Sequence, residues 1–255
     1  MPQDRTIICI KWGTLYPAEY VNVLYRAVCR HLQGSFRFVC LTDDGKGLLA
    51  GIDALPIPDI GLMPAQWRGG CWPKVGLFSD PLHDLAGTAL FLDLDSVIVG
   101  DLGPIFDLPG DIVTLDSGPW RYGPGTAPRA MSCFLRYRIG AHGDLVDRFR
   151  RDRDRMIARY GNDQNFLLGE GPSLSYFPQE WVVSFKYHLR QPLLMDRFRG
   201  PRRPPPEARL VAFHGRPRPI DLIRPPAGNW DVFPHFGRGK VDWMVDYWTE
   251  HGGTA

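Results

Sequence analysis

Short apolar runs, each closed by small or polar residues, recur along the chain and predict the strands of a sheet. The runs cover residues 6–10, 36–41, 89–92, 97–99, 112–115, 130–135 and 209–213. They are rich in branched and aromatic side chains, as buried strands are. Between the first two runs, apolar residues recur at helical spacing, which predicts a helix over residues 18–32. A strand, a helix and a second strand in this order predict that the sheet begins with parallel strands.

The second half of the chain contains two further segments with helical spacing. Residues 143–160 can place their apolar side chains on one face, and the alternating arginines and aspartates of residues 150–155 form a charge-compensated opposite face. Near the C-terminus, six apolar residues recur at helical spacing: Val241, Trp243, Met244, Val245, Tyr247 and Trp248. This pattern predicts a C-terminal extension, residues 220–255, that packs back on the domain. The alternative is that its aromatic face rests on a membrane surface.

Composition and charge limit the classes of function. The length of 255 residues suits one large α/β domain or two small ones. The 30 basic and 28 acidic residues give a net charge of +2, which creates no general field for nucleic acid or anionic lipid. The five cysteines are odd in number and never closely paired, as in a reducing compartment. No signal peptide and no membrane-spanning apolar run is found, so we expect a cytoplasmic protein, with contact to the inner face of the membrane as an option.

The first chemical candidate is the pair Asp93 and Asp95, which lies between two apolar runs. Side chains alternate along a strand, so these two carboxylates point the same way. Neighbouring carboxylates at the end of a buried strand repel each other unless a cation lies between them or one is protonated. Oxygen ligands suit magnesium, manganese or calcium. The pair therefore predicts a divalent-metal site, and the alternative is two solvated acids at a turn.

Other candidates also follow strand ends, where parallel sheets bind their ligands. Trp12 and Tyr16 follow the first predicted strand, and Asp43 follows the second. An aromatic ring here could stack on a nucleotide base, and the carboxylate could accept hydrogen bonds from ribose or base. Lys74 follows Pro73 at the start of a predicted helix. It is either a surface lysine or a cation held for phosphate.

Two later segments combine polar groups with apolar surroundings. Asp163 and Gln164 follow the helix predicted to end at residue 160. They belong either to a turn capped by Asn162 or Asp163, or to a substrate site. His214 follows the last predicted strand, with Gly215 and two arginines behind it. It is either a hydrogen-bonded surface histidine or a functional ligand.

Taken together, these motifs resemble the GT-A glycosyltransferases, and among them the glycogenin-like and lipopolysaccharide-galactosyltransferase-like enzymes of family 8. The likeness runs from about residue 6 to residue 219 and includes Asp93-Leu94-Asp95, Asp163-Gln164 and a closing His214-Gly215 segment. The family's closing motif is H-x-x-G-x-x-K-P; here the spacing is shorter and Arg218 replaces the lysine. The resemblance implies an α/β fold: one GT-A (Rossmann-like) domain over residues 1–255, with a mostly parallel central sheet flanked by helices.

The resemblance also implies an activity, which is retaining, metal-dependent transfer of a hexose. The donor would be a nucleotide sugar with uridine diphosphate as leaving group, and the acceptor a glycan or glycolipid of bacterial-type surface polysaccharide or lipopolysaccharide. Asp93, Asp95 and His214 would bind Mn²⁺ (or Mg²⁺), and Asp163 and Gln164 would be catalytic. The donor-binding residues would be Trp12, Tyr16, Asp43, Lys74, Asp93, Leu94, Gly215 and Arg218. No nucleic acid is expected as a partner, and peripheral membrane contact is an option.

Two other functions fit part of the pattern. Residues 92–97 also resemble the haloacid-dehalogenase phosphatase signature, in which Asp93 would be a nucleophile beside magnesium. That signature needs a later acidic pair, for which Asp144 and Asp147 are the candidates, and it normally opens the sheet, whereas here two strands come first. A sugar-nucleotide-binding relative without activity is the third alternative. The family's usual Asn-Ser-Gly stretch is replaced here by Met131-Ser132-Cys133.

Overall fold

A computed structural model describes residues 5–67 and 69–255, and within them the chain forms two compact units. The first unit comprises the described residues up to Tyr16, together with Gly34–Asp93 and Pro104–Phe177. The second unit comprises Pro17–Gln33, Leu94–Gly103 and Pro178–Ala255. Each unit is therefore assembled from segments that are distant in the sequence.

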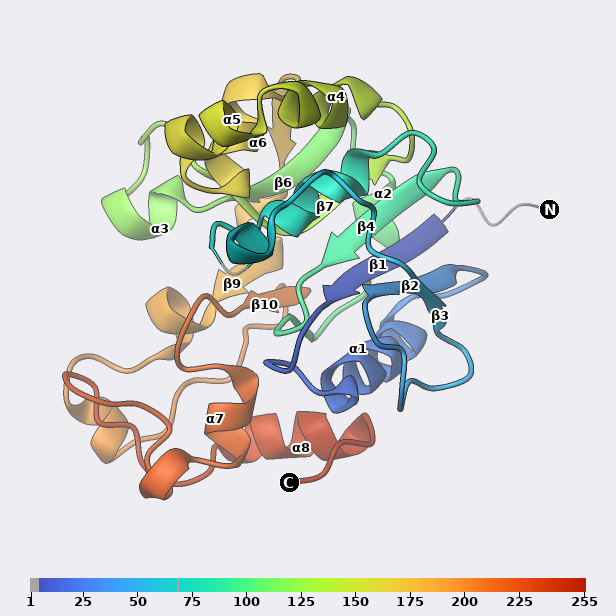
Figure 1. Cartoon of the computed structure of the whole chain (residues 1–255). Helices are drawn as coiled ribbons and strands as arrows, with labels where there is room; N and C mark the ends of the chain where they lie inside the picture. The colour runs from blue at the N-terminus through green and yellow to red at the C-terminus, as the bar shows by residue number, and fades with distance from the viewer. Residues whose placement is uncertain (1–4, 68) are drawn as a thin grey trace. The chain divides into compact units, whose positions relative to one another are not determined.

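The first unit contains a seven-stranded sheet (Figure 1). Its strands, in spatial order, are β3 (Asp53–Leu55), β2 (Arg37–Thr42), β1 (Arg5–Lys11), β4 (Thr88–Leu92), β7 (Ala130–Arg138), β6 (Ile112–Asp116) and β8 (Leu174–Tyr176). Neighbouring strands β3, β2, β1 and β4 are parallel, β6 and β8 are parallel, and β7 runs antiparallel to both β4 and β6. The predicted α/β fold with a mostly parallel sheet is confirmed.

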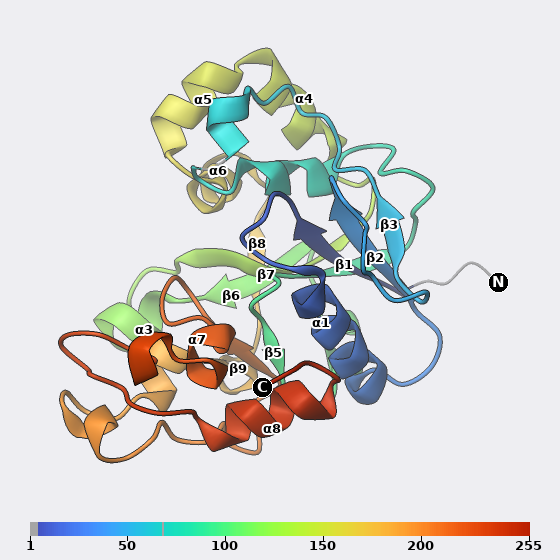
Figure 2. The same ribbon diagram turned by 60° about the horizontal axis from the view of Figure 1, so that its bottom comes forward.

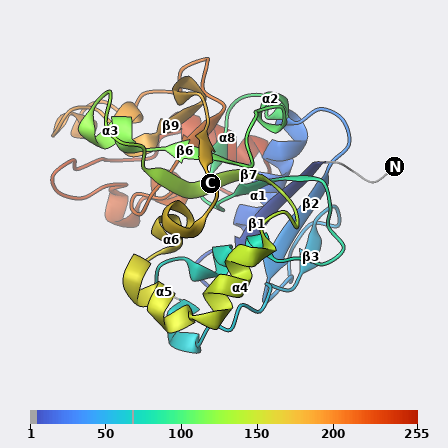
Figure 3. The same cartoon turned by 90° about the horizontal axis from the view of Figure 1, so that it is seen from above.

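One face of this sheet is covered by helices of the same unit. These are the 3₁₀ helix Trp72–Phe78, α4 (Gly143–Arg151), α5 (Arg153–Tyr160) and α6 (Asp163–Glu170), which gather on one side of the sheet in Figures 1 and 3. Alternate strand residues such as Ile8, Val39 and Phe91 pack against them in one core. The intervening residues, such as Cys9 and Cys40, are also fully buried. Burial of both sets explains why the strands appear in the sequence as continuous apolar runs.

Shorter elements complete the first unit. They are the 3₁₀ helix Pro64–Trp67, α3 (Gly118–Tyr122) and α2 (Gly103–Phe106), where the chain returns from the second unit. The helix predicted over residues 143–160 is divided in two, which corrects that prediction. Asp152 adopts φ −127° and ψ 35°, so the helical path is interrupted between α4 and α5.

The second unit contains a three-stranded sheet in the order β5 (Val97–Ile98), β10 (Leu210–Ala212) and β9 (Val182–Ser184). Its helices are α1 (Ala18–His31), α7 (Pro219–Ile223) and α8 (Asp242–Glu250), and Figure 2 shows α7 and α8 side by side. Short helical turns lie at Gln179–Trp181, Phe185–Leu189, Met195–Arg197 and Pro226–Gly228. None of the described helices has the length and apolar character needed to cross a bilayer.

The aromatic residues of the C-terminal tail face inward within the second unit. Trp243, Met244, Tyr247 and Trp248 of α8 are buried. The Tyr247 hydroxyl accepts a hydrogen bond from the backbone N–H of Ile98 (3.2 Å), and the Trp248 ring packs edge-on against Tyr20 (4.9 Å between centroids). The alternative in which this aromatic face rests on a membrane is therefore wrong. The single-domain description of residues 1–255 stays a prediction.

Candidate functional site

The carboxyl ends of β1, β2 and β4 meet at one edge of the large sheet. The chain continues from β1 to β2 on one side and places β4 on the other side, so the strand order switches direction between β1 and β4. Such a switch point leaves a space where α/β sheets bind ligands. Trp12 follows β1, Asp43 follows β2 and Asp93 follows β4. The fold therefore brings these three predicted site residues to the same edge.

The loops after β1 and β2 are bonded to each other. The backbone N–H of Gly13 donates to the Asp43 carboxylate (2.9 Å), and the Lys11 ammonium donates to the carbonyl oxygen of Asp44 (3.1 Å). The half-buried Trp12 ring packs edge-on against Trp67, with 6.5 Å between the ring centroids. The Asp43 carboxylate therefore stabilises the loop after β1, and it is also a candidate for ribose recognition.

Lys74 lies at the centre of a buried charge cluster. Its side chain is only 7% exposed, and its ammonium lies 2.8 Å from the Asp93 carboxylate and donates to the carbonyl oxygen of Ser132 (3.3 Å). Burial by itself lowers the pKa of a lysine, but the carboxylates of Asp93 and Asp163 outweigh this and raise the pKa of Lys74. The lysine is therefore a fixed cation at the end of β4, and the surface-lysine alternative is wrong.

Asp163 is the second carboxylate of this cluster and is 5% exposed. Burial raises its pKa to about 6; the Lys74 ammonium opposes this rise, and the charge of Asp93 adds to it. Burial also raises the pKa of Asp93, against the opposing effect of Lys74. One ammonium therefore serves two carboxylates, which leaves an excess of negative charge when both are ionised.

Local backbone structure explains how Asp163 reaches the cluster. The side chain of Asn162 accepts a hydrogen bond from the backbone N–H of Asn165 (2.8 Å) and caps α6. The backbone N–H of Asp163 donates to the carbonyl oxygen of Gly70 (2.9 Å), which lies just before the 3₁₀ helix that carries Lys74. Asn162 is the cap, so Asp163 is available for the charge cluster, and half-buried Gln164 is the next residue of α6.

Five of the predicted residues belong to the second unit: Leu94, Asp95, His214, Gly215 and Arg218. The Nε2 atom of His214 lies 2.8 Å from the Ser184 hydroxyl. The His214 ring stacks on Tyr187, with 5.7 Å between the ring centroids. The backbone N–H of Ser184 donates to Nδ1 of His188 (2.8 Å). Ser184, His188 and Tyr187 were not predicted as site residues. The only signal in the sequence was the mixture of aromatic and basic residues around them.

Other predicted residues of the second unit lie near the start of α7 and α1. Arg218 precedes α7; its backbone N–H donates to the Asp221 carboxylate (2.9 Å), and its guanidinium lies 4.0 Å from the same group. Burial raises the pKa of Tyr20 in α1; the charges of Asp95 and Asp221 add to this rise, and the charge of Arg218 opposes it. Leu94 is buried beside half-exposed Asp95, whereas Gly215 is exposed. Tyr16 is half-buried at the end of a first-unit segment.

The predicted metal ligands divide between the units, with Asp93 in the first and Asp95 and His214 in the second. Carboxylates and imidazole are suitable donors for Mn²⁺. However, no group of three or more His, Cys, Asp or Glu side chains in residues 5–67 and 69–255 is arranged to hold a metal ion. The Asp93 carboxylate is already paired with Lys74 and the His214 ring with Ser184. The role of Asp93, Asp95 and His214 as metal ligands therefore stays a prediction.

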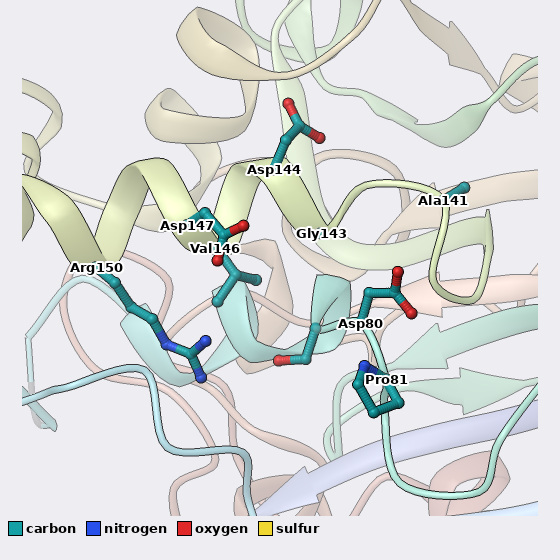
Figure 4. A pocket seen from close by; sticks show the side chains of 9 residues that line it. Asp80, Pro81, Ala141, Gly143, Asp144, Val146, Asp147 and Arg150 are labelled. Atoms are coloured by element: carbon teal, nitrogen blue, oxygen red, sulfur yellow. The ribbon is translucent and has the colours of Figure 1, made fainter.

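A cavity of about 470 Å³ in the first unit lies elsewhere (Figure 4). It is lined by residues that follow the helix Trp72–Phe78 and by the start of α4, including Asp80, Asp144 and Asp147. The backbone N–H of Ile139, just after β7, donates to the carbonyl oxygen of Gly87, just before β4. This part of the chain therefore lies at the amino end of β4, opposite Asp93. The cavity contains none of the residues predicted for glycosyl transfer, although Asp144 and Asp147 are the acidic pair of the phosphatase alternative.

Comparison with solved structures identifies the fold. The galactosyltransferase LgtC, in complex with donor and acceptor sugar analogues, superposes with a TM-score of 0.60 at 15% identity, covering 98% of this chain and 97% of that chain. An active-site mutant of LgtC, in which glutamate replaces a glutamine, gives 0.59 at 16% identity, covering 96% and 94%. The glycosyltransferase GlyE of Streptococcus pneumoniae TIGR4 gives 0.60 at 13% identity, with 98% of this chain covering 62% of GlyE. No protein-family model and no curated protein sequence matches the chain. The chain has the GT-A fold of LgtC.

Proposed function

We propose that this protein is a glycosyltransferase that moves a hexose from a nucleotide sugar, with uridine diphosphate as leaving group, to a glycan or glycolipid. The observation that carries the proposal is the buried Lys74, held between Asp93 and Asp163 at the switch point of a sheet with the fold of LgtC. A fixed ammonium in a water-poor site stabilises charge that develops on a departing diphosphate. LgtC has been solved with donor and acceptor sugar analogues, which supports sugars as the substrate class.

The donor would lie along the edge formed by β1, β2 and β4. Trp12 or Tyr16 would stack on the uracil, and Asp43 would accept hydrogen bonds from ribose or base. Lys74 and Arg218 would bind phosphate oxygens, and an arginine can do so through two parallel hydrogen bonds. Leu94 and Gly215 would contribute backbone contacts to the donor.

Asp163 and Gln164 are our candidates for the catalytic residues. A carboxyl group with a pKa of about 6 can change protonation near neutral pH, which suits a group that orients or exchanges a proton with an acceptor hydroxyl. The glutamine replaced in the active-site mutant of LgtC supports an amide side chain in this role. We propose retention of configuration, as in the family that the sequence resembles.

We keep Mn²⁺ or Mg²⁺ as the proposed cofactor, with Asp93, Asp95 and His214 as its ligands. When bound, such an ion would neutralise diphosphate charge. Because the described residues form no preassembled centre, we derive no step through it. Asp93 would have to exchange part of its contact with Lys74 for the ion, and the excess negative charge of the cluster favours an additional cation.

No observation favours the phosphatase alternative. Its second acidic pair would be Asp144 and Asp147, but both lie by the cavity at the amino end of β4, away from Asp93. The phosphatase would hydrolyse p-nitrophenyl phosphate with magnesium and lose this activity on Asp93→Asn substitution. We expect no such hydrolysis.

Calorimetric titration of uridine diphosphate into the full chain tests the proposal. We expect binding that needs Mn²⁺ and disappears with a chelator, and loss of this binding in Asp95→Asn. Asp101→Asn, an exposed aspartate in the same segment, is the matched control and should bind normally. The proposal fails if no nucleotide sugar or diphosphate binds with metal present, or if affinity is the same with and without chelator.

A further inference from the structure

Two loops of the second unit each expose large apolar side chains. The first loop, residues 191–203, exposes Leu193, Leu194 and Phe198, with 77% of Phe198 accessible. The second loop, residues 231–240, exposes Val232 and Phe233 at 73% and 77%. Isolated exposed apolar residues are ordinary, but five large ones on two loops that side-chain contacts join indicate a contact surface. We call these two loops together the double-loop surface.

Two internal contacts hold the loops side by side. The Arg190 guanidinium forms a nearly buried ion pair with Asp231, which links the starts of the two loops. His235 Nδ1 lies 3.3 Å from the fully buried carboxylate of Asp196. The second loop is also closed on itself, because the backbone N–H of Trp230 donates to the carbonyl oxygen of Gly237 (2.9 Å). The apolar side chains are therefore presented by a bonded framework.

The acidic and basic side chains of the double-loop surface differ in exposure. Both of its acids, Asp196 and Asp231, are buried in the contacts between the loops. Its exposed charged residues are all basic: Arg197, Arg199, Arg202, Arg203, Arg238 and Lys240. Of these six residues, Arg203 alone forms an ion pair with another described residue, a 3.7 Å contact with Asp246. The surface is thus locally cationic although the whole chain has a net charge of only +2.

We infer that the double-loop surface binds the surface of an anionic lipid bilayer. Exposed Phe, Leu and Val can enter the boundary between headgroups and acyl chains, while arginines and lysine at the same surface contact lipid phosphates. A second copy of this chain is disfavoured, because pairing this surface with itself would bring like charges together. The site differs from the aromatic face of α8, which is buried.

Sedimentation of the full chain with lipid vesicles tests this inference. We expect binding to vesicles that contain phosphatidylglycerol, much weaker binding to pure phosphatidylcholine, and loss of binding as salt increases. Phe198→Ser with Phe233→Ser should lower the partition coefficient about a hundredfold, because each buried aromatic ring contributes about one order of magnitude. Arg197→Gln with Arg199→Gln should lower it about fivefold per charge, on anionic vesicles alone.

Matched controls come from the first unit. Leu168→Ser removes an exposed apolar side chain and Arg155→Gln an exposed cation, and neither should change vesicle binding. All variants alter exposed side chains, so circular dichroism should confirm native folding. The inference is overturned if phosphatidylglycerol vesicles do not bind the protein, or if the paired phenylalanine variant binds them like the parent. It is also overturned if those phenylalanines instead support a concentration-dependent dimer. None of these outcomes depends on glycosyl transfer.

Discussion

At the scale of single residues, the cluster of Lys74, Asp93 and Asp163 has an unusual charge balance. A buried ion pair contributes little to stability when complete, but removing one partner leaves an uncompensated charge in a poorly solvated place. Here one lysine faces two aspartates, so the cluster is incompletely neutralised when both acids are ionised. Such an arrangement costs stability and is typical of sites that bind another charged group.

Asp163→Asn should make the protein more stable at pH 8. The pKa of Asp163 is about 6 in the folded state, above the ordinary value of 3.8, so the folded state holds the proton more tightly than the unfolded state. The stabilisation that comes from this tighter proton binding is complete below pH 3.8 and is lost as the pH rises through 6. The shift corresponds to about 3 kcal/mol, so we expect the variant to gain roughly 1–3 kcal/mol at pH 8 and little at pH 3.8. Denaturant unfolding at the two pH values checks this, and an equal gain at both would contradict the pKa.

Lys74→Met should have the opposite effect. It leaves Asp93 and Asp163 without their shared cation, and breaking a buried pair in this way costs about 3–5 kcal/mol. The double variant Lys74→Met with Asp93→Asn should recover part of this loss, because one orphaned carboxylate has been neutralised. A double-mutant cycle by chemical unfolding measures the coupling. Strictly additive losses would mean that the 2.8 Å contact contributes no interaction energy.

The sequence indicated which residue types belong to the site but not their mutual geometry. Asp93, Asp43 and Trp12 were predictable, because strand ends of a parallel sheet share one edge. The burial of Lys74 was not, since one lysine after Pro73 gives no periodicity to interpret. Ser184 was missed because its contact with His214 joins positions thirty residues apart. The metal and catalytic roles of the predicted residues remain predictions.

At the scale of elements, strands were predicted well where apolar runs were long. β1, β2 and β7 each bury nearly every residue, so their sequences contain an uninterrupted signal. β3, β8 and β9 have only three residues each and every one includes a polar residue, so no apolar run marks them, whereas the similarly short β5 and β10 are wholly apolar. The division between α4 and α5 was missed because Asp152 lies in an Arg/Asp run whose charges are compatible with one continuous helix or with two helices.

Asn162→Ala should destabilise α6 without changing the charges of the site. The Asn162 side chain accepts the N–H of Asn165, one of the helix-terminal donors that otherwise lack a partner. Loss of such a cap costs about 1 kcal/mol. Asn162→Ser, which retains a capping oxygen, should lose much less, and the two variants can be compared by thermal unfolding. Equal losses would indicate that the cap bond does not support the helix.

At the scale of the whole molecule, the order of helices and strands along the chain does not predict to which of the two units each of them belongs. The predicted strand–helix–strand start is present, yet α1 belongs to the second unit and β1 and β2 to the first. Similarly, β5 follows β4 after four residues but pairs with β10, more than a hundred residues later. Such long-range pairings depend on tertiary packing, for which local sequence patterns carry no signal.

Trp248→Ala should lower the local stability of three segments of the second unit that are distant in the sequence. The Trp248 ring packs on Tyr20 and its Nε1–H donates to Glu19 (3.0 Å), so one side chain of α8 connects the C-terminus to the start of α1. Truncating a buried tryptophan costs about 3–5 kcal/mol. Hydrogen exchange should therefore accelerate in α1, α8 and the strand pair β5–β10, which Tyr247 bonds to α8 through Ile98.

The matched control for this prediction is Trp243→Ala, which truncates a buried tryptophan of the same helix at the opposite end. Both variants should destabilise α8, because each leaves a cavity of similar size. Only Trp248→Ala removes the contacts with α1, so only that variant should raise exchange in α1 more than in α7. If the two variants give the same exchange pattern, α8 acts through general packing, and the specific role of the Trp248 contacts with Glu19 and Tyr20 is excluded.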